Sequence, residues 1–416
     1  MPRAIGLMSG TSLDGVDAAW LDTDGESVRA FGPTLTIPYD DELRRDLRTI
    51  LDLAPGLAST DPRLASVETR LTECHVRAVK ELGRPADLIG FHGQTILHRP
   101  DQRRTWQVGD ATRLARETGI PVAYDFRSAD VASGGEGAPL APVYHAALAR
   151  DLDRPLAVLN IGGVANVTWI GKSGIGESVI GERGIRERGA RDSEIDERGG
   201  SGKETHRSGI GENGVSEGGT REGLIGDKGI SHAGALLAFD TGPGNGPLDD
   251  WVRRHTGQAF DRHGALALSG TVDTAVLGRL MAHPYFARPA PKSLDRLDFS
   301  HALAASGVDA MTAADGAATL VAFTAASVAA SVFPAPPRRW LVAGGGRHNP
   351  AIMGALRIAL GVPVEPVETV GWDGDALEAQ CFGFLAVRVA CGLPLSFPGT
   401  TNAPAPMPGG RIVSGL

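Results

Sequence analysis

The chain has 416 residues, a net charge of −8 and 42% hydrophobic residues, values that suit a globular protein with two lobes. The negative charge argues against a general nucleic-acid or anionic-membrane binder, so we expect a small-molecule partner. The three cysteines lie far apart or in predicted helices and indicate neither a disulfide framework nor a protein-bound metal cluster. The sequence opens without an apolar signal core and contains no long uncharged span, which predicts a cytoplasmic protein outside the membrane.

The first predicted feature is a hairpin whose tip is rich in glycine and hydroxyl residues. An apolar strand at 4–8 enters the tip, and an alternating stretch at 16–21 leaves it. Glycines let backbone N–H groups approach an anion and hydroxyl groups add donors, so the tip favours phosphate binding. An ordinary turn is the alternative, because the Walker pattern and the dinucleotide-binding glycine pattern are both missing. The candidate phosphate-binding residues are Gly10, Thr11, Ser12, Leu13, Asp14, Gly15, Val16 and Asp17.

Several predicted strands in the first 150 residues end at polar side chains. Two helices are expected within 38–83, and strands follow at 86–91, 106–110 and 121–124. Polar residues at such ends lie where α/β sheets bind ligands, and a glycine-rich run at 133–139 follows the last of them. A metal pair of two histidines is an alternative, although a structural or substrate-contacting histidine fits the spacing better. The polar residues in question are His92 (with His98 as the metal alternative), Gln94, Asp125 and Arg127.

A second hairpin of the same form begins the second half of the chain. Apolar strands at 156–161 and 164–169 flank a tip made of Gly162 and Gly163. Two glycine-tipped hairpins, one at the start of each half, are what a duplicated lobe would give. Each tip would offer backbone donors to one side of a polyphosphate.

Residues 171–235 differ from the rest of the chain in composition. They are rich in glycine, arginine and glutamate and contain neither aromatic residues nor proline, so they cannot bury enough apolar area to offset the entropy of ordering. We expect an exposed, disordered insertion. An RNA-binding tail is the alternative, but the balanced charges and missing aromatics argue against it. The flanking residues Ile170 and Leu236 are expected to remain paired as strands.

Asp240 is the candidate general base. It follows a strand at 236–239 and precedes a glycine/proline turn that leads to a helix from 248 onward. A carboxylate fixed at the end of a strand is well placed to take a proton. The alternative is an aspartate that caps the helix, but capping would not require the neighbouring glycines, so we favour catalysis.

The last third of the chain adds a nucleotide loop and a long helix. A strand at 340–343 breaks at a glycine turn before a helix at 351–360, which would let a nucleotide lie against bare backbone. An alanine-rich helix at 313–333 is expected to be buried between the lobes. Lys292 could reach a phosphate or a carboxylate, although a surface lysine is the simpler interpretation. The remaining candidates are Gly344, Gly345, Gly346 and Asn349 in the loop, and Glu378 in the first turns of the last helix.

These segments together resemble the anhydro-N-acetylmuramic acid kinase family, within the group of sugar kinases, actin and Hsp70. The resemblance runs in order through nearly the whole chain apart from the insertion and the extreme tail, and eight separated motifs are far more specific than one glycine-rich loop. The matching segments are residues 9–17, 91–95, 107–110, 125–127, 137–140, 160–166, 240–245, and 344–346 followed by 349–350.

The resemblance implies an α/β, two-lobed, actin-like ATPase (ribonuclease H-like) duplicated fold with ATP and Mg²⁺ in the interlobe cleft. It implies that 1,6-anhydro-N-acetylmuramic acid, ATP and water give N-acetylmuramic acid 6-phosphate and ADP during peptidoglycan recycling. By motif, residues 10–17 would bind ATP phosphates, Asp240 would be the catalytic base, and residues 344–346 would lie near the adenosine. Asp14 or Asp17 would orient Mg²⁺ through water. The candidates for the sugar are His92, Gln94, Asp125, Arg127 and Glu378.

The expected domain organisation is an N-terminal lobe at 1–150, a C-terminal lobe at 151–393 interrupted by 171–235, and an extended tail at 394–416. The expected partners are the anhydrosugar and ATP, without nucleic acid or membrane, and a homodimer is left open. The alternative function is a chaperone-like ATPase or sensor of the same fold. Asp240 and the polar strand ends argue against it, since a sensor needs neither a base nor a sugar pocket.

Overall fold

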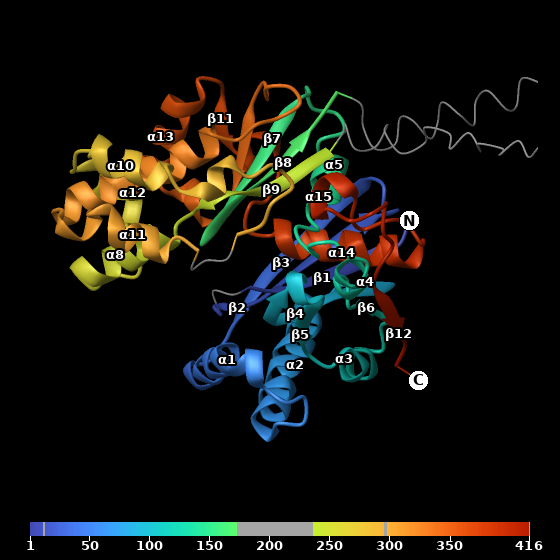
Figure 1. Cartoon of the computed structure of the whole chain (residues 1–416). Helices are drawn as coiled ribbons and strands as arrows, with labels where there is room; N and C mark the ends of the chain where they lie inside the picture. The colour runs from blue at the N-terminus through green and yellow to red at the C-terminus, as the bar shows by residue number, and fades with distance from the viewer. Residues whose placement is uncertain (11–12, 173–235, 295–297, 416) are drawn as a thin grey trace, which may run out of the picture.

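The computed structural model describes residues 1–10, 13–172, 236–294 and 298–415, which form two α/β lobes around two sheets (Figure 1). The first sheet has the strand order β12-β6-β4-β1-β2-β3, and β5 pairs with β4 outside this path. Its strands are β1 (Arg3–Ser9), β2 (Gly15–Thr23), β3 (Val28–Pro38), β4 (Leu88–Arg99), β5 (Arg104–Val108), β6 (Val122–Tyr124) and β12 (Arg411–Val413).

The second sheet repeats the plan of the first. Its order is β11-β10-β7-β8-β9, so in each lobe three consecutive antiparallel strands are followed by two parallel ones. This repetition confirms the predicted duplicated, two-lobed α/β fold. The strands are β7 (Leu156–Ile161), β8 (Val164–Ile170), β9 (Leu236–Pro243), β10 (Trp340–Ala343) and β11 (Val364–Pro366).

Two helices cover the first sheet within 38–83, as predicted. Helix α1 (Asp41–Leu53) begins after the N-cap Asp40, and α2 (Pro62–Leu82) begins after the N-cap Asp61. Leucines at helical spacing on α1 lie in the core of the first lobe, because one apolar face must leave water. Helix α3 (Ala111–Thr118) lies beside α2 (Figure 1).

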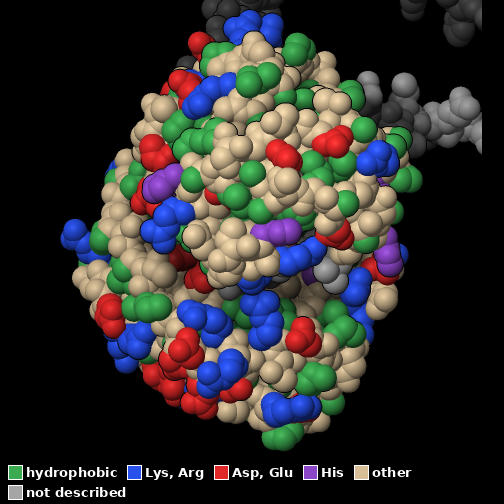
Figure 2. All heavy atoms as spheres, turned by 90° about the vertical axis from the view of Figure 1, so that its left-hand side faces the viewer, with side chains coloured by type: hydrophobic (Ala, Val, Ile, Leu, Met, Phe, Trp, Pro, Cys, Tyr) green, Lys and Arg blue, Asp and Glu red, His purple; other side chains and the backbone are tan. Residues whose placement is uncertain are grey.

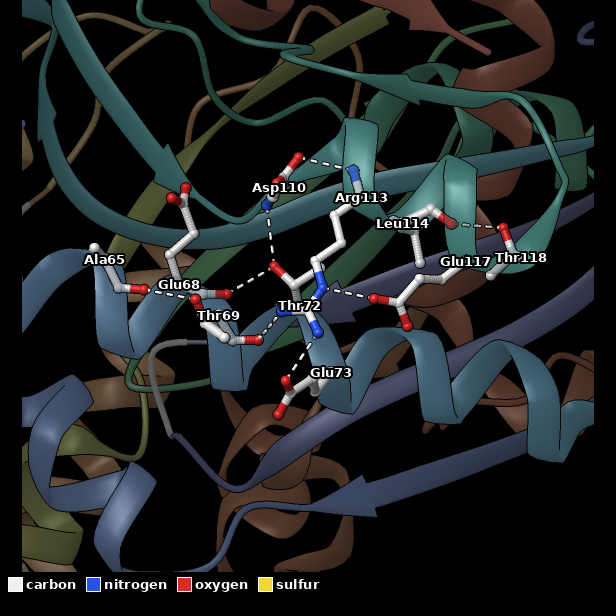
Figure 3. Close-up of polar contacts among 10 residues, drawn as sticks. All are labelled: Ala65, Glu68, Thr69, Thr72, Glu73, Asp110, Arg113, Leu114, Glu117 and Thr118. Atoms are coloured by element: carbon white, nitrogen blue, oxygen red, sulfur yellow. Dashed lines mark hydrogen bonds and ion pairs between the residues drawn. The ribbon is translucent and has the colours of Figure 1, made fainter. Parts of the chain in front are cut away.

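A polar network fixes α3 to α2 (Figure 3). Asp110 is the N-cap of α3: its Oδ1 accepts from the Arg113 N–H at 2.8 Å, and its own N–H donates to Thr72 Oγ1 at 3.0 Å. The Arg113 side chain reaches Glu73 at 2.8 Å and Glu117 at 2.6 Å. The polar end of the strand before α3 therefore serves as a helix cap.

The helices of the second lobe gather beside its sheet (Figure 1). We predicted that the alanine-rich segment at 313–333 is a helix between the lobes; α12 (Ala313–Ala329) is that helix, but it packs in the second lobe's own core. Its partners there include α8 and α10, whose apolar faces it covers. The other helices are α8 (Gly246–Thr256), α9 (Ala265–Leu268), α10 (Thr274–Met281), α11 (Ser300–Ser306) and α13 (Pro350–Leu360).

Helix α14 (Leu377–Ala390) joins the two lobes. It packs on β1, β2 and β4 so closely that a Cβ at Gly6 would lie 1.7 Å from the Ala379 carbonyl oxygen. Its residues also share a buried cluster with Leu156 and Leu341 of the second sheet. We assigned this helix to the second lobe alone, whereas the first lobe also depends on it.

The C-terminal segment after residue 393 is more ordered than the extended tail we expected. It contains the short helix α15 (Pro398–Thr401) and the strand β12, which pairs antiparallel with β6 of the first sheet. Two further helices, α4 (Ser128–Ala132) and α5 (Pro142–Leu148), follow β6. The first lobe is therefore built from both ends of the chain.

The expected insertion falls almost entirely on 173–235, outside the described residues. Its flanks behave as predicted, because Ile170 pairs with Leu236 at the far end of the β8–β9 ladder. In the part of the chain that is described, none of the helices has the length and apolar character needed to cross a bilayer.

Candidate active site

The second hairpin tip and the glycine loop after β10 lie against one another. The Gly162 carbonyl accepts from the Asn245 N–H at 2.7 Å, which fixes the turn after β9 on the hairpin. A Cβ added at Gly163 would meet nothing within 4 Å, so space is open above the tip. Gly344 has φ +74°, and a Cβ there would lie 2.4 Å from Asn160 Oδ1. The structure thus brings together two of the segments predicted to bind ATP.

Arg347 holds the glycine loop in place. Its side chain is buried and donates to the Gly344 carbonyl at 3.0 Å, to Glu368 at 2.8 Å and to Asp375 at 2.7 Å. Asn349 has a structural role as the N-cap of α13, and its Oδ1 accepts from two backbone N–H groups. Gly345 is exposed, and Gly346 is buried against Ile161 of the hairpin.

The first hairpin tip offers mainly backbone to a ligand. Thr11 and Ser12 fall outside the described residues. Leu13 (φ +60°) and Val16 have buried side chains in the core of the first lobe, so only their backbone groups could contact ATP. Gly15 is required by strand packing, since a Cβ would lie 2.2 Å from the Ile37 carbonyl oxygen.

Acidic side chains gather near this tip. Asp14 is exposed, and Asp17 is half-buried and accepts from Thr36 Oγ1 at 2.6 Å. Burial raises the pKa of Asp17, and the negative charges of Asp375 and Asp14 raise it further. A cation bound near these carboxylates would offset their mutual repulsion and stabilise the ionised form of Asp17.

His92 and Arg127 form a buried pair at the sugar candidates. Arg127 donates from Nε and Nη2 to His92 Nε2 at 3.2 and 3.0 Å, and from Nη1 to the Gly137 carbonyl at 2.7 Å. The His92 Nδ1–H donates to the Gly93 carbonyl at 2.7 Å. Burial and the Arg127 charge hold the pKa of His92 well below its usual value, so the imidazole is neutral. His92 therefore orients Arg127, and the described residues contain no group of three metal-ligating side chains.

Two residues that were predicted to follow the end of a strand, His92 and Gln94, lie within a strand in the structure. Strand β4 continues to Arg99, so His92 and Gln94 lie inside it; Gly93, with φ +71°, accounts for the irregular register there. The Gln94 side chain is buried, and its Oε1 has no hydrogen-bond partner among the described residues.

Glu378 and Asp125 have different surroundings. Glu378 lies in the first turn of α14 and is solvent-accessible, yet its pKa is raised, first by burial and then by Asp17, against the opposing charge of Arg127. Asp125 instead forms an ion pair with Arg411 of β12 at 3.2 Å and lines a separate hollow of about 250 Å³. The structure does not bring Asp125 into the Arg127 group.

Asp240 lies inside β9 beside a bulge at Thr241, since Ala165 faces Gly242 and Asn166 faces Asp240. Its Oδ2 accepts from the Leu294 N–H at 2.8 Å, and its carbonyl accepts from the Tyr285 hydroxyl at 2.5 Å. Burial raises the pKa of Asp240 to about 7. The hydrogen bond from the Leu294 N–H lowers this pKa, and the negative charge of Glu136 raises it. Helix α8 has Asn245 as its N-cap, so the helix-cap alternative for Asp240 is wrong.

Lys292 does not point freely toward a ligand. Its Nζ donates to the Tyr285 carbonyl at 3.1 Å and lies 4.6 Å from the centre of the Tyr285 ring.

The molecular surface is hollowed between the upper, second lobe and the lower, first lobe, and charged side chains of both signs border the hollow (Figure 2).

A sequence model of the family described as anhydro-N-acetylmuramic acid kinase matches residues 2–176 and 230–414. The chain belongs to this family. Two relatives named anhydro-N-acetylmuramic acid kinase are similar along their whole length: one from Acidiphilium cryptum, 57% identical over 99% of this chain and 98% of the relative, and one from Gluconobacter oxydans, 49% identical over 99% and 100%. A solved structure, component A of (R)-2-hydroxyglutaryl-CoA dehydratase from Acidaminococcus fermentans, covers 94% of this chain and is itself covered in full, with 12% identity and a TM-score of 0.39.

Sequence reasoning missed three residues of this anhydro-N-acetylmuramic acid kinase family member. Arg347 and Tyr285 act through tertiary contacts that no local pattern announces. Glu136 does have a local signal, since it is an acidic residue inside a glycine run, and its Oε2 accepts from Ser293 Oγ at 3.1 Å near Asp240.

Proposed function

We propose that this chain is an ATP-dependent kinase that converts 1,6-anhydro-N-acetylmuramic acid, ATP and water to N-acetylmuramic acid 6-phosphate and ADP in cell-wall recycling. The observation that carries the proposal is the family match, which runs through both lobes and both glycine hairpins. The reaction needs a base, donors for phosphate oxygens and a cation for the sugar carboxylate. The chain offers candidates for each.

Asp240 is the proposed base. It accepts a proton from water, the water oxygen attacks the anomeric carbon, and the bond from that carbon to the bridging oxygen breaks. The released oxygen at position 6 attacks the γ-phosphorus, and ADP leaves. A pKa of about 7 suits this task, because the carboxylate is then ionised in part near neutral pH and remains basic enough to hold the proton.

Arg127 is the proposed partner of the lactyl carboxylate. His92 and the Gly137 carbonyl hold it in one orientation, and one N–H on each terminal nitrogen remains for the substrate. Glu378 and Gln94 would receive sugar hydroxyls. Gln94 Oε1 has no hydrogen-bond partner in the part of the chain that the structure describes, which supports this role. Asp125 stays a weaker candidate because of its ion pair with Arg411.

The backbone N–H groups of the two hairpin tips are proposed to face the ATP phosphates, with residues 344–346 near the adenosine. Kinase chemistry calls for a divalent cation, and we propose Mg²⁺. Asp14 and Asp17 fit its hydrated form, since burial raises the pKa of Asp17 and the negative charges of Asp375 and Asp14 raise it further. When bound, Mg²⁺ neutralises charge on the β- and γ-phosphates. We place the reaction in the cytoplasm, where ATP is available.

The test is a reaction with Mg-ATP and the anhydrosugar in ¹⁸O-water, quenched early and read by mass spectrometry. We expect one ¹⁸O at C1 of the product, and loss of turnover in Asp240→Asn with ATP binding retained. The control variant is Asp52→Asn, an exposed aspartate on α1. A second control incubates finished product in ¹⁸O-water to measure exchange at C1. Equal turnover in Asp240→Asn would remove this residue from its role.

The chaperone-like alternative makes a different prediction in the same assay. An ATPase or sensor would hydrolyse ATP without the anhydrosugar, whereas the kinase consumes ATP in step with sugar phosphate. ADP release measured with and without sugar separates the two functions.

A further inference from the structure

A short segment of the second lobe, residues 292–294, forms hydrogen bonds with both the backbone and the side chain of Asp240. The Asp240 N–H donates to the Lys292 carbonyl at 2.9 Å, and the Leu294 N–H donates to Asp240 Oδ2 at 2.8 Å. Ser293, between the two, turns its hydroxyl to Glu136 Oε2 at 3.1 Å. The orientation of the Asp240 carboxylate therefore depends on a segment that is held from outside the second sheet.

Glu136 comes from the glycine-rich run between the two lobes, and that run is itself fixed. The buried carboxylate of Asp130 accepts from the Gly137 N–H at 2.6 Å, and the Asp130 carbonyl accepts from the Gly135 N–H at 2.9 Å. The Glu136 N–H donates to the Thr401 carbonyl at 2.6 Å. With backbone bonds at and around Glu136, its side chain has little freedom to leave Ser293.

The neighbour of Glu136 also contacts the sugar candidates. The Gly137 carbonyl accepts from Arg127 Nη1 at 2.7 Å. The residue that contacts Arg127, the proposed partner of the sugar carboxylate, is therefore the chain neighbour of Glu136, which bonds Ser293. We propose that Glu136 is a positioning residue of the kinase: through Ser293 it holds residues 292–294 so that the Leu294 N–H orients the Asp240 carboxylate. This inference rests on the proposed role of Asp240.

Glu136 acts on Asp240 in two separable ways, by the hydrogen bond through Ser293 and by its negative charge. Among the described residues, Tyr285 interacts with Asp240, and Lys292 and Arg288 lie against Tyr285; substitutions at Glu136 keep all three of these groups in the chain. Glu136→Gln removes the charge but keeps an oxygen that can accept from Ser293. Glu136→Ala removes both, and Ser293→Ala removes the bond but keeps the charge.

The experiment measures kcat and the pH dependence of kcat/KM for these three variants and for the double variant Glu136→Ala/Ser293→Ala. We expect Glu136→Ala and Ser293→Ala each to lower kcat at least tenfold. The double variant should be no slower than the slower single variant, because both changes break the same bond. Glu136→Gln should keep kcat within threefold and move the acidic limb of kcat/KM to lower pH, since a negative charge near Asp240 is lost.

Several outcomes would overturn the inference. If the two single effects multiply in the double variant, Glu136 and Ser293 do not act through one bond. If kcat of Glu136→Gln falls as far as kcat of Glu136→Ala, the positioning role through Ser293 is wrong. If the acidic limb of Glu136→Gln stays in place, the second effect, that of the Glu136 charge on Asp240, is wrong. Glu81→Gln, an exposed glutamate at the end of α2, is the matched control and should leave both readouts unchanged. Circular dichroism checks that each variant folds.

The inference and the proposed function can fail separately. If Asp240→Asn keeps full turnover, the base assignment fails and the positioning role fails with it. If Asp240→Asn is inactive while the Glu136 and Ser293 effects multiply, the kinase stands and only the positioning role is lost.

Discussion

Ionised Asp240 should cost the folded protein stability, and Asp240→Asn should remove that cost. Burial raises the pKa of this carboxyl from 3.8 to about 7. Well below pH 3.8 the group is protonated in both the folded and the unfolded chain, so it has no effect. Between about pH 4 and 7 the unfolded chain ionises first, and stability falls as the pH rises.

The magnitude follows from the size of the change in pKa. At about 1.4 kcal/mol per pKa unit, the rise to about 7 corresponds to at most about 4 kcal/mol lost by pH 8. Asp240 is partly accessible to water, so we expect about 2 to 4 kcal/mol. Asparagine has nearly the same shape, and its oxygen can still accept from the Leu294 N–H, so the substitution isolates the charge.

The assay is the melting temperature of both proteins, measured between pH 4.5 and 8.5. The melting temperature of Asp240→Asn should exceed that of the unaltered protein by a margin that grows from pH 4.5 to 7 and then levels off at about 2 to 5 °C. Asp52→Asn, at an exposed position, should show a difference that does not change with pH. A flat difference for Asp240→Asn, or a variant less stable at pH 8, would refute the raised pKa and with it the argument for this residue as the base.

Three further predictions test the nucleotide side of the molecule and the insertion. Gly344→Ala should lose about 1 to 3 kcal/mol of stability and raise the KM for ATP, because φ is +74° and the new Cβ would lie 2.4 Å from Asn160 Oδ1; unchanged melting and KM would contradict this. Chelation by EDTA should abolish turnover and Mg²⁺ should restore it, whereas activity that persists in EDTA argues against a divalent cation. Replacing residues 173–235 by a short Gly-Ser linker should leave kcat within twofold, since the Ile170–Leu236 pair remains; loss of most activity with circular dichroism unchanged would show that the insertion contributes to turnover.

Local patterns predicted the elements well where the physical cause is itself local. The two glycine-tipped hairpins and strand β10 follow from spacing and turn chemistry. The duplication could be inferred because each half begins with the same hairpin. The order β6-β4-β1-β2-β3 within the first sheet matches the order β11-β10-β7-β8-β9 of the second.

Predictions that depended on where an element packs were weaker. Both α12 and α14 are apolar on most sides, so composition alone does not say which of them lies between the lobes; the glycines at the contact of α14 with β1 decide it. The continuation of β4 past Gly93 was missed because glycine is typical of strand ends. The partners of Arg347 lie far along the chain, and only the fold brings them together.

The pairing of β12 with β6 has a consequence for biosynthesis. The sheet that starts at residue 3 is finished only by residues 411–413, and α14, which packs on it, also comes late in the chain. The second sheet, by contrast, uses strands only from residues 156–366. We therefore expect the first lobe to acquire its native packing after the second, with its unfinished edge at β6 in need of protection until residues 411–413 have been synthesised.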